Sequence, residues 1–366
     1  MVSEQRVIIG NCLDVLRGMP DESIDMVITS PPYWALRDYG SAPVIWGGEK
    51  SCNHQWGEHI EPARGGVNES ANVRANRKGE ANINHPTVSH YCSKCGAWKG
   101  QLGLEPSPIQ YVDHLMLIFD EVKRVLKSTG ACWVNIGDTY ATVSGSGFQT
   151  DNISAKKERD AISNANEIRK GLGRYGFKEK SLCQIPSRFA IAMTDHGWIL
   201  RNEIIWHKPN AMPVSTKDRF TVDFEKLYFF VKEPKYFFKQ QFEEMKMPTA
   251  KTRFPLGKLG NPNPKYSGNE YDAEKLDGKR NMRTVWDINT QANSLEHCAM
   301  FPKSLIDIPI KSCCPDGGTV LDPFCGSGTT LEYCFDNDIN GIGIEINPAY
   351  EGFIKKRAKM NQRRLY

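Results

Sequence analysis

The stretch VLDPFCGSGTTLEYCF, residues 320–335, indicates the fold class of this chain. Its apolar start is typical of a short strand, its glycines of a tight turn, and its last third of a helix. Gly326 and Gly328 allow a ligand to approach the backbone closely, and Thr329 or Thr330 can help to start the helix. We therefore predict an α/β unit with a ligand at the glycine turn.

The same alternation of strands and helices extends outward over most of the chain. Apolar patterns predict strands at 6–11, 25–30, 131–138, 198–209, 226–233, 318–324 and 340–346. They predict helices at 12–19, 111–127, 186–197, 327–338 and 347–362. Because strands that alternate with helices form sheets covered on both faces, we predict an α/β fold with a doubly wound, mostly parallel sheet.

Length and composition limit the class of protein. The chain has 366 residues, a net charge of +4 and 11 cysteines, which suits one large domain with insertions or two domains. We expect these cysteines to be reduced thiols in a cytoplasmic protein, since a small disulfide scaffold is excluded at this length. No apolar run of 18 residues occurs and no signal-peptide pattern is seen, so we expect no membrane partner.

Three long polar stretches interrupt the alternation, at 38–108, 139–180 and 235–295. Loops of this length in a compact domain are usually either functional or disordered. We therefore expect them to be insertions with roles of their own.

An acidic residue ends the strand that follows the glycine turn. Glu345 lies 17 residues after Gly328, where a carboxylate can accept hydrogen bonds from ribose hydroxyls. The turn is not G-x-G-x-x-G, so a dinucleotide is not its natural ligand. We predict an adenosine ligand without a phosphate chain; an ordinary turn with a solvated glutamate is the plainer alternative.

The second distinctive stretch is DMVITSPPYW, residues 25–34, in which a strand runs into a hydroxyl, two prolines and two aromatic rings. Proline cannot continue a strand ladder, so a strand end closed by a turn would explain part of this pattern. It does not explain why a serine and two aromatic rings flank the prolines.

Together these residues resemble a known family. DPFCGSGTT (322–330) resembles the S-adenosylmethionine motif of amino-methylating DNA methyltransferases, and TSPPYW (29–34) resembles their catalytic motif. The catalytic motif comes first here, an order that resembles the β class, whose methyltransferase sheet is circularly permuted. HCAMFPKSLIDIPI (297–310) resembles the segment that covers the cofactor's methionine end in that class.

The resemblance implies a division of the chain and a set of cofactor-binding residues. Residues 1–37, 109–234 and 296–366 would form the catalytic domain, 38–108 an insertion, and 235–295 the target-recognition region. The residues implied to line or hold the cofactor are Asp322, Phe324, Gly326, Gly328 and Thr329 in the glycine loop, with Glu345 at the ribose and Pro302 near the methionine. Asn11 stands where the family usually has an aspartate that contacts the adenine, with Asp14 as a substitute. Asparagine can accept from an amino group but has no charge.

The chemistry of amine methylation explains the Ser-Pro-Pro-Tyr residues. An exocyclic base amine is a poor nucleophile, because its lone pair is delocalised into the ring. Ser30 and the carbonyl of Pro31 can accept its hydrogens outside the ring plane, and Pro31 and Pro32 hold the backbone rigid. Tyr33 offers a face on which a base flipped out of the double helix can stack. These residues thus form the predicted catalytic site.

The sequence indicates less directly which base receives the methyl group. Carbon-5 methylation of cytosine is excluded, because the family that performs it uses a Pro-Cys dipeptide and none occurs here. In the resembled family Ser-Pro-Pro-Tyr is commoner in cytosine N4 enzymes, so N4 of cytosine is favoured over N6 of adenine. Two competing hypotheses are an enzyme of this fold that acts on RNA or a protein amide, and a non-catalytic nucleic-acid binding module.

The first insertion holds four metal-ligating side chains. Cys52 and His54 are followed by Cys92-x-x-Cys95-Gly, a pattern typical of a zinc knuckle. We predict a structural Zn²⁺ held by these four residues; four unligated side chains in a loop are the competing interpretation.

The last insertion is basic. Residues 246–283 contain nine Lys/Arg and four Asp/Glu, with Phe254, Tyr266 and Tyr271 among them. This favours double-stranded DNA as the partner, although a solvated charged loop would have similar composition. Residues 154–180 are a second candidate DNA-facing loop. The resemblance also allows a homodimer and a cognate restriction nuclease.

Overall fold

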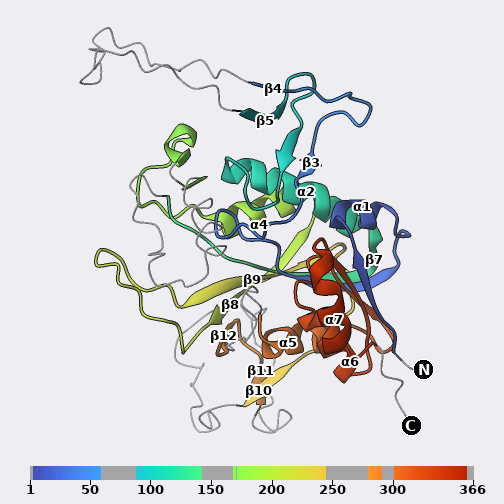
Figure 1. Ribbon diagram of the computed structural model, residues 1–366. Coiled ribbons are helices and arrows are strands. Elements are labelled where there is room, and N and C mark those ends of the chain that lie inside the picture. Colours follow the sequence, from blue (N-terminus) through green and yellow to red (C-terminus); the bar gives the residue numbers. More distant parts are fainter. Residues whose placement is uncertain are drawn as a thin grey trace, which may run out of the picture. The chain divides into compact units, whose positions relative to one another are not determined.

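The computed structural model describes residues 3–58, 88–141, 168–169, 171–244, 279–290 and 301–360 (Figure 1). The residues group into two units, one of 1–33, 116–138 and 184–366, and one of 34–115 and 139–183. Phe254, Tyr266 and Tyr271 lie outside the described residues, as does most of the candidate loop 154–180.

The first unit is built on an eight-stranded sheet with the order β1-β14-β13-β2-β7-β9-β8-β12. Its strands are β1 (Gln5–Ile9), β14 (Asn340–Glu345), β13 (Thr319–Asp322), β2 (Ile24–Thr29), β7 (Leu126–Ile136), β9 (Phe224–Val231), β8 (Ile199–His207) and β12 (Val285–Asp287). Only β9 runs against its neighbours β7 and β8, and the other pairs are parallel. The predicted mostly parallel sheet is therefore confirmed.

Helices cover both faces of this sheet. In the first unit they are α1 (Cys12–Arg17), the second half of α2 (Pro108–Val125), α4 (Ile185–Asp195), α5 (Lys303–Cys313), α6 (Thr329–Asp336) and α7 (Glu351–Arg357), with the short 3₁₀ turn η5 (Pro348–Tyr350). A second 3₁₀ turn, η2 (Gly171–Tyr175), belongs to the second unit. Figure 1 shows α4 on one side of β9 and α5 on the other. None of the helices in the described part of the chain is long and apolar enough to cross a membrane.

Strand β9 shows why both faces are covered. Leu227, Phe229 and Val231 pack in the cluster that includes Leu305 and Ile306 of α5. Phe230 points the other way, and its ring lies 6.1 Å from that of Phe189 in α4. Successive side chains of a strand point to opposite faces, so an almost wholly apolar strand requires a helix on each side.

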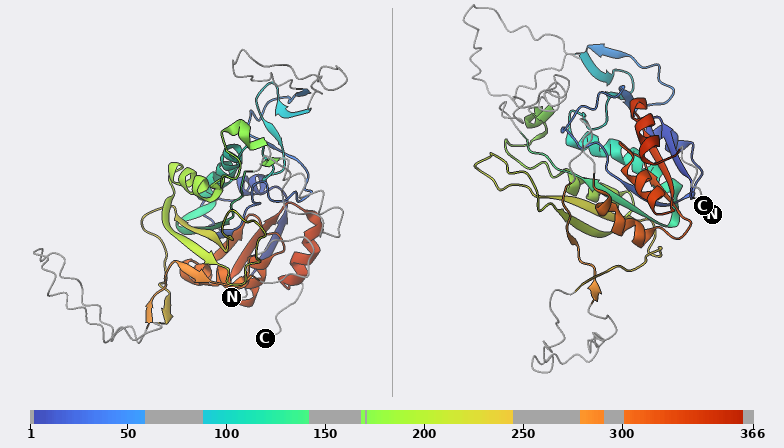
Figure 2. Two further views of the ribbon diagram at one scale, coloured as in Figure 1. Left: turned by 90° about the vertical axis from the view of Figure 1, so that its left-hand side faces the viewer. Right: turned by 60° about the horizontal axis from the view of Figure 1, so that its bottom comes forward.

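The strands that come first and last in the sequence, β1 and β14, are neighbours in the sheet. β1 pairs in parallel with β14, from Gln5 beside Gly341 to Ile9 beside Glu345. β13, on the other side of β14, pairs in parallel with β2. The loops after β1, β2, β13 and β14 therefore all begin at the carboxyl ends of these strands, on one edge of the sheet, although they come from both ends of the chain. Figure 2 shows the blue and red strands side by side. This edge carries the motif residues that the sequence indicated.

The second unit contains a small antiparallel sheet that the sequence did not predict. Its order is β3-β6-β5-β4, from β3 (Val44–Trp46), β6 (Trp98–Gly100), β5 (Val88–Cys92) and β4 (Trp56–Glu58). His114 stacks between Trp46 and Trp98, with ring centroids 5.2 and 5.4 Å away. Oε1 of the buried Glu105 lies 2.9 Å from His114 Nδ1. The unit thus has a core of its own.

Two short strands within the last insertion, 235–295, pair with each other. β10 (Phe242–Glu244) pairs antiparallel with β11 (Lys279–Asn281). Arg280 and Arg283 both pair with Glu243, at 2.7 and 2.5 Å. The end of β10 and the start of β11 therefore lie side by side, with Glu244 opposite Lys279.

Candidate active site and metal centre

The loop after β13 is anchored by a buried carboxylate. Asp322 accepts hydrogen bonds from the hydroxyls of Thr29 and Thr330, both at 2.6 Å, and from the backbone N–H of Phe324 at 3.1 Å. Burial raises the pKa of Asp322, and these donors oppose that shift. Thr29 is the last residue of β2, so Asp322 joins the start of the catalytic motif to the glycine loop. Its predicted contact with the cofactor stays a prediction.

Both glycines of the loop adopt backbone conformations that favour glycine. Gly326 has φ +53° and donates its N–H to Glu345 Oε2 at 2.9 Å. Gly328 has φ +85°, and a Cβ there would lie 3.0 Å from Ile354 of α7. The next residue, Thr329, is buried at the start of α6. A residue with a Cβ would therefore be strained at both positions.

Glu345 ends β14 beside this loop. Its two oxygens accept from the backbone N–H groups of Asn347 and Gly326, at 2.8 and 2.9 Å. Burial raises the pKa of Glu345. Each oxygen keeps a further lone pair, so the carboxylate can still accept from ligand hydroxyls.

Asn11, which is predicted to contact the adenine, also caps a helix. Asn11 is the N-cap of α1, and its Oδ1 accepts from the N–H of Leu13 at 2.8 Å. The side-chain amide can still offer Nδ2, which is a donor. Asp14 is largely exposed and lies 3.5 Å from Arg17.

The remaining predicted cofactor residues lie near helix starts and loop ends. Pro302 is buried and is the N-cap of α5, while Phe324 is half-buried after β13. Cys325 is buried in the same loop, and burial raises its pKa well above the usual value. A thiol of this kind is a poor nucleophile, which agrees with the exclusion of carbon-5 chemistry.

The predicted catalytic motif leaves the sheet beside the glycine loop. Ser30, Pro31 and Pro32 follow β2 directly, and β2 pairs with β13 through Met26 and Val27. Pro31 is buried, whereas Ser30 and Tyr33 are half-buried. The fold therefore brings together two motifs that are almost 300 residues apart, as the hydrogen bond between Thr29 and Asp322 shows.

Three polar residues around Tyr33 were not predicted from the sequence. The Tyr33 hydroxyl lies 2.6 Å from Glu225 Oε2 and 2.8 Å from Asn135 Oδ1, and Lys208 pairs with Glu225 Oε1. A signal existed for Asn135, because it interrupts the apolar run of a buried strand. Glu225 and Lys208 carry no such signal. The antiparallel course of β9 brings Glu225 to this edge, and Lys208 directly follows the end of β8 beside it.

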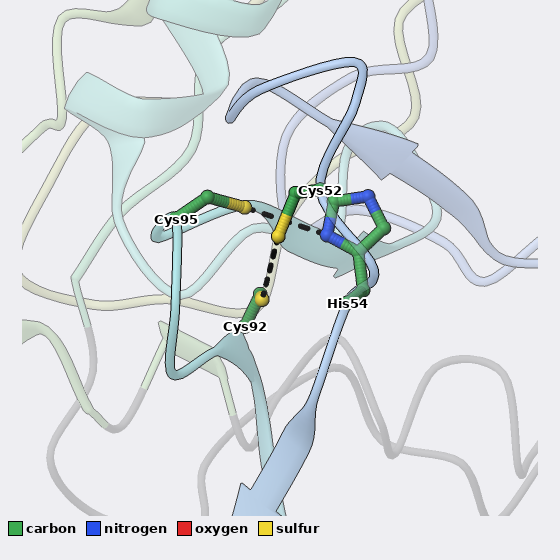
Figure 3. Close-up of side chains that lie close together, drawn as sticks. All are labelled: Cys52, His54, Cys92 and Cys95. Carbon is green, nitrogen blue, oxygen red and sulfur yellow. Dashed lines mark hydrogen bonds between the residues drawn. The ribbon is translucent and has the colours of Figure 1, made fainter.

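The four predicted metal ligands lie together in the second unit (Figure 3). Their ligand atoms are all within 4.8 Å of one another, with Cys52 Sγ 3.9 Å from Cys92 Sγ and Cys95 Sγ 3.4 Å from His54 Nδ1. None of these cysteines forms a disulfide. The structure therefore contains a Cys₃His group that could hold a metal ion.

The donor distances suit a tetrahedral zinc ion. Bonds of about 2.3 Å to sulfur and 2.0–2.1 Å to nitrogen place two sulfurs about 3.8 Å apart and a sulfur and a nitrogen about 3.6 Å apart. The turn between Cys92 and Cys95 is closed by Gly96, which has φ +73°. Gln55 donates its N–H to Cys92 Sγ at 3.4 Å, an interaction that stabilises a thiolate.

The chain resembles characterised proteins over nearly its whole length. The type II methyltransferase M.SmaI of Serratia marcescens is 31% identical over 96% of this chain and 90% of its own. M.Cfr9I of Citrobacter freundii is 34% identical over 93% of this chain and 83% of its own.

The fold and a family model agree with these relatives. The structure of the PvuII DNA methyltransferase, described as cytosine-N4-specific, superposes with a TM-score of 0.50 at 16% identity, covering 100% of this chain and 88% of that one. The model of the N6/N4 DNA methylase family matches residues 24–356. The chain therefore belongs to the DNA methylase family and is an S-adenosylmethionine-dependent DNA amino-methyltransferase of the cytosine-N4 or adenine-N6 kind.

Proposed function

We propose that this protein methylates N4 of cytosine at a specific site in double-stranded DNA, with N6 of adenine as the alternative target. The observation that carries the proposal is the junction of β2 and β13. There Thr29 and Asp322 hold Ser30 and Pro31 beside the glycine loop. Ser-Pro-Pro-Tyr is the form of the motif that favours cytosine.

The residues of the chain would act on the base as follows. Glu345 and the loop at Gly326 would hold S-adenosylmethionine, which supplies a methyl group activated by its positive sulfur. Ser30 Oγ and the Pro31 carbonyl would accept the amine hydrogens and turn the nitrogen lone pair out of the ring plane. The methylated ammonium product is acidic and loses its proton readily, so Ser30 need not be a strong base. Tyr33 would stack on the flipped base.

The site and the base can be found in one experiment. We expect that DNA from cells expressing the protein contains N4-methylcytosine within one short sequence, read by modification-sensitive sequencing. N6-methyladenine instead would support the alternative target. If purified enzyme methylated structured RNA or a protein while leaving duplex DNA unmodified, the proposed substrate would be wrong.

We further propose that residues 235–295 contribute to recognition of that sequence. The pairing of β10 with β11 supports this role, because Arg280 of β11 belongs to the first unit and adds a basic side chain within this region. Type II relatives suggest a cognate restriction nuclease as a partner and a cytoplasmic setting. A homodimer is a further arrangement that the resemblance implies.

We also propose that Cys52, His54, Cys92 and Cys95 bind one structural Zn²⁺. The second unit's sheet is small, and a metal ion would fix the ends of β4 and β5 that carry these ligands. The group contains no residue of the proposed catalytic motif. Loss of zinc should therefore reduce stability or DNA affinity before it reduces the rate of methyl transfer.

Elemental analysis tests this site directly. Protein purified without added metal should contain about one zinc per chain, and the Cys92→Ser/Cys95→Ser variant should contain none. Cys132→Ser is the matched control, because Cys132 is a buried thiol of β7 outside the group. A wild type without zinc, or a double variant that retains a full equivalent, would contradict the assignment.

A further inference from the structure

The hydroxyl of Tyr33 takes part in a polar network that the catalytic motif itself does not explain. It lies 2.6 Å from Glu225 Oε2 and 2.8 Å from Asn135 Oδ1. Asn135 donates its Nδ2 to the same Glu225 oxygen and to the carbonyl of Lys226, both at 3.1 Å. The single phenol hydrogen can be donated to one acceptor at a time. The shorter distance and the charge of the carboxylate favour Glu225.

Glu225 is in turn held from its other side. Its Oε1 pairs with Lys208, whose ammonium lies 4.5 Å from the centre of the Trp206 ring. The side chains of Lys208 and Glu225 are only 18% and 21% exposed, which limits screening by solvent. Backbone pairing supports the same arrangement, since Lys208 N–H donates to the carbonyl of Asp223 at 2.7 Å. The carboxylate therefore has a defined position at the start of β9.

The ring of Tyr33 is also restricted at its edge. A Cβ on Gly137, just after β7, would lie 2.5 Å from Tyr33 Cε2. The ring thus packs directly on the glycine backbone, and only a residue without a side chain allows this approach. Contacts at the edge and at the hydroxyl together fix both the place and the tilt of the ring.

We propose that Glu225 is a positioning residue of the base-binding site and acts through the hydroxyl of Tyr33. This inference rests on the proposed function, in which Tyr33 stacks on the flipped base. A flexible tyrosine would lose conformational freedom when the base stacks on it, and this loss would weaken binding. A ring that Glu225 already holds does not incur that cost when the base binds. Glu225 should therefore favour capture of the flipped base without touching the base or the cofactor.

The test compares Tyr33→Phe, Glu225→Gln and the double variant. Tyr33→Phe keeps the stacking face but removes the donor, and Glu225→Gln keeps the shape but removes the charge. Each should lower the single-turnover rate at subsaturating DNA about fivefold to tenfold, since a charge-assisted hydrogen bond is lost. The double variant should be no slower than Tyr33→Phe, because both changes break the same interaction.

A second measurement reports flipping itself. A duplex with pyrrolocytosine, a fluorescent cytosine analogue, at the target position found in the sequencing experiment should show a smaller change in fluorescence on binding to either variant than on binding to the wild type. S-adenosylmethionine affinity should stay unchanged. Glu203→Gln is the matched control, because Glu203 on the adjacent strand pairs with Lys226 at 2.8 Å. It should behave like the wild type in both assays.

The outcomes separate this inference from the proposed function. A wild type that transfers no methyl group to DNA would overturn both. An active wild type with fully additive losses in the double variant would overturn the role of Glu225 alone. If Glu225→Gln does not fold, the Tyr33→Phe variant alone tests the inference. An unchanged rate and an unchanged fluorescence in Tyr33→Phe would also overturn the role of Glu225.

Discussion

Ser30→Ala should lower the single-turnover rate of methyl transfer by about 100-fold while S-adenosylmethionine binds with near-normal affinity. The hydroxyl is expected to accept an amine hydrogen only as the nitrogen becomes tetrahedral, so its loss removes an interaction of the transition state. Removal of one such preorganised group typically costs about 10²–10³ in rate. The affinity for S-adenosylmethionine should persist, because none of the residues predicted to bind the cofactor lies on β2 or in the Ser-Pro-Pro-Tyr motif that follows it.

Rapid-quench methylation with enzyme in excess over DNA measures this step, and calorimetry measures the affinity. Ser23→Ala provides the control, since Ser23 precedes the opposite end of β2 and its hydroxyl donates to the carbonyl of Pro20 at 2.8 Å. An unchanged single-turnover rate in Ser30→Ala would remove Ser30 from the mechanism.

Gly326→Val should reduce the affinity for S-adenosylmethionine by about 100-fold or more. Gly326 has φ +53°, a conformation that costs an ordinary residue about 1–2 kcal/mol and a β-branched one more. Relaxing that strain would turn its N–H away from Glu345, to which it now donates at 2.9 Å. The proposed ribose-binding carboxylate would then lose one of the two backbone donors that orient it.

Isothermal calorimetry on folded protein measures this change. Gly352→Val is the matched control, because Gly352 lies in α7 with open space around it and no positive φ. The affinity of Gly352→Val for S-adenosylmethionine should match that of the wild type. Wild-type affinity in Gly326→Val would show that the glycine loop does not hold the cofactor.

The sequence predicted the parts of the fold that have a strong period. The strand expected at 340–346 is β14, and the helix expected at 327–338 is α6, each displaced by no more than about two residues. The small sheet of the second unit was missed, because strands of three residues such as β3 and β6 are too short to show alternation. Their position is set by contacts of Trp46 and Trp98 with His114, which no local pattern records.

The candidate site shows the same limit. The motif residues Ser30 and Gly326 could be named from neighbours in the sequence, and the metal group from the spacing of its cysteines. Glu225 could not, because its meeting with Tyr33 depends on an antiparallel strand placed between two strands that run the other way. Asn11 shows a different gap: the sequence indicates an acceptor for a ligand, but not that the same oxygen also accepts the helix-capping hydrogen bond from Leu13.

The pairing of β1 with β14 has a consequence for how the protein is made. On a ribosome, β1 emerges first, yet the strand beside it emerges some 330 residues later. At roughly 5–20 residues per second, this interval lasts about 20–70 s. During that time an apolar strand lacks its hydrogen-bonding neighbour, and long-range pairing of this kind makes folding slow. A nascent chain should therefore depend on chaperones until its last strand is complete, even though the finished enzyme would not.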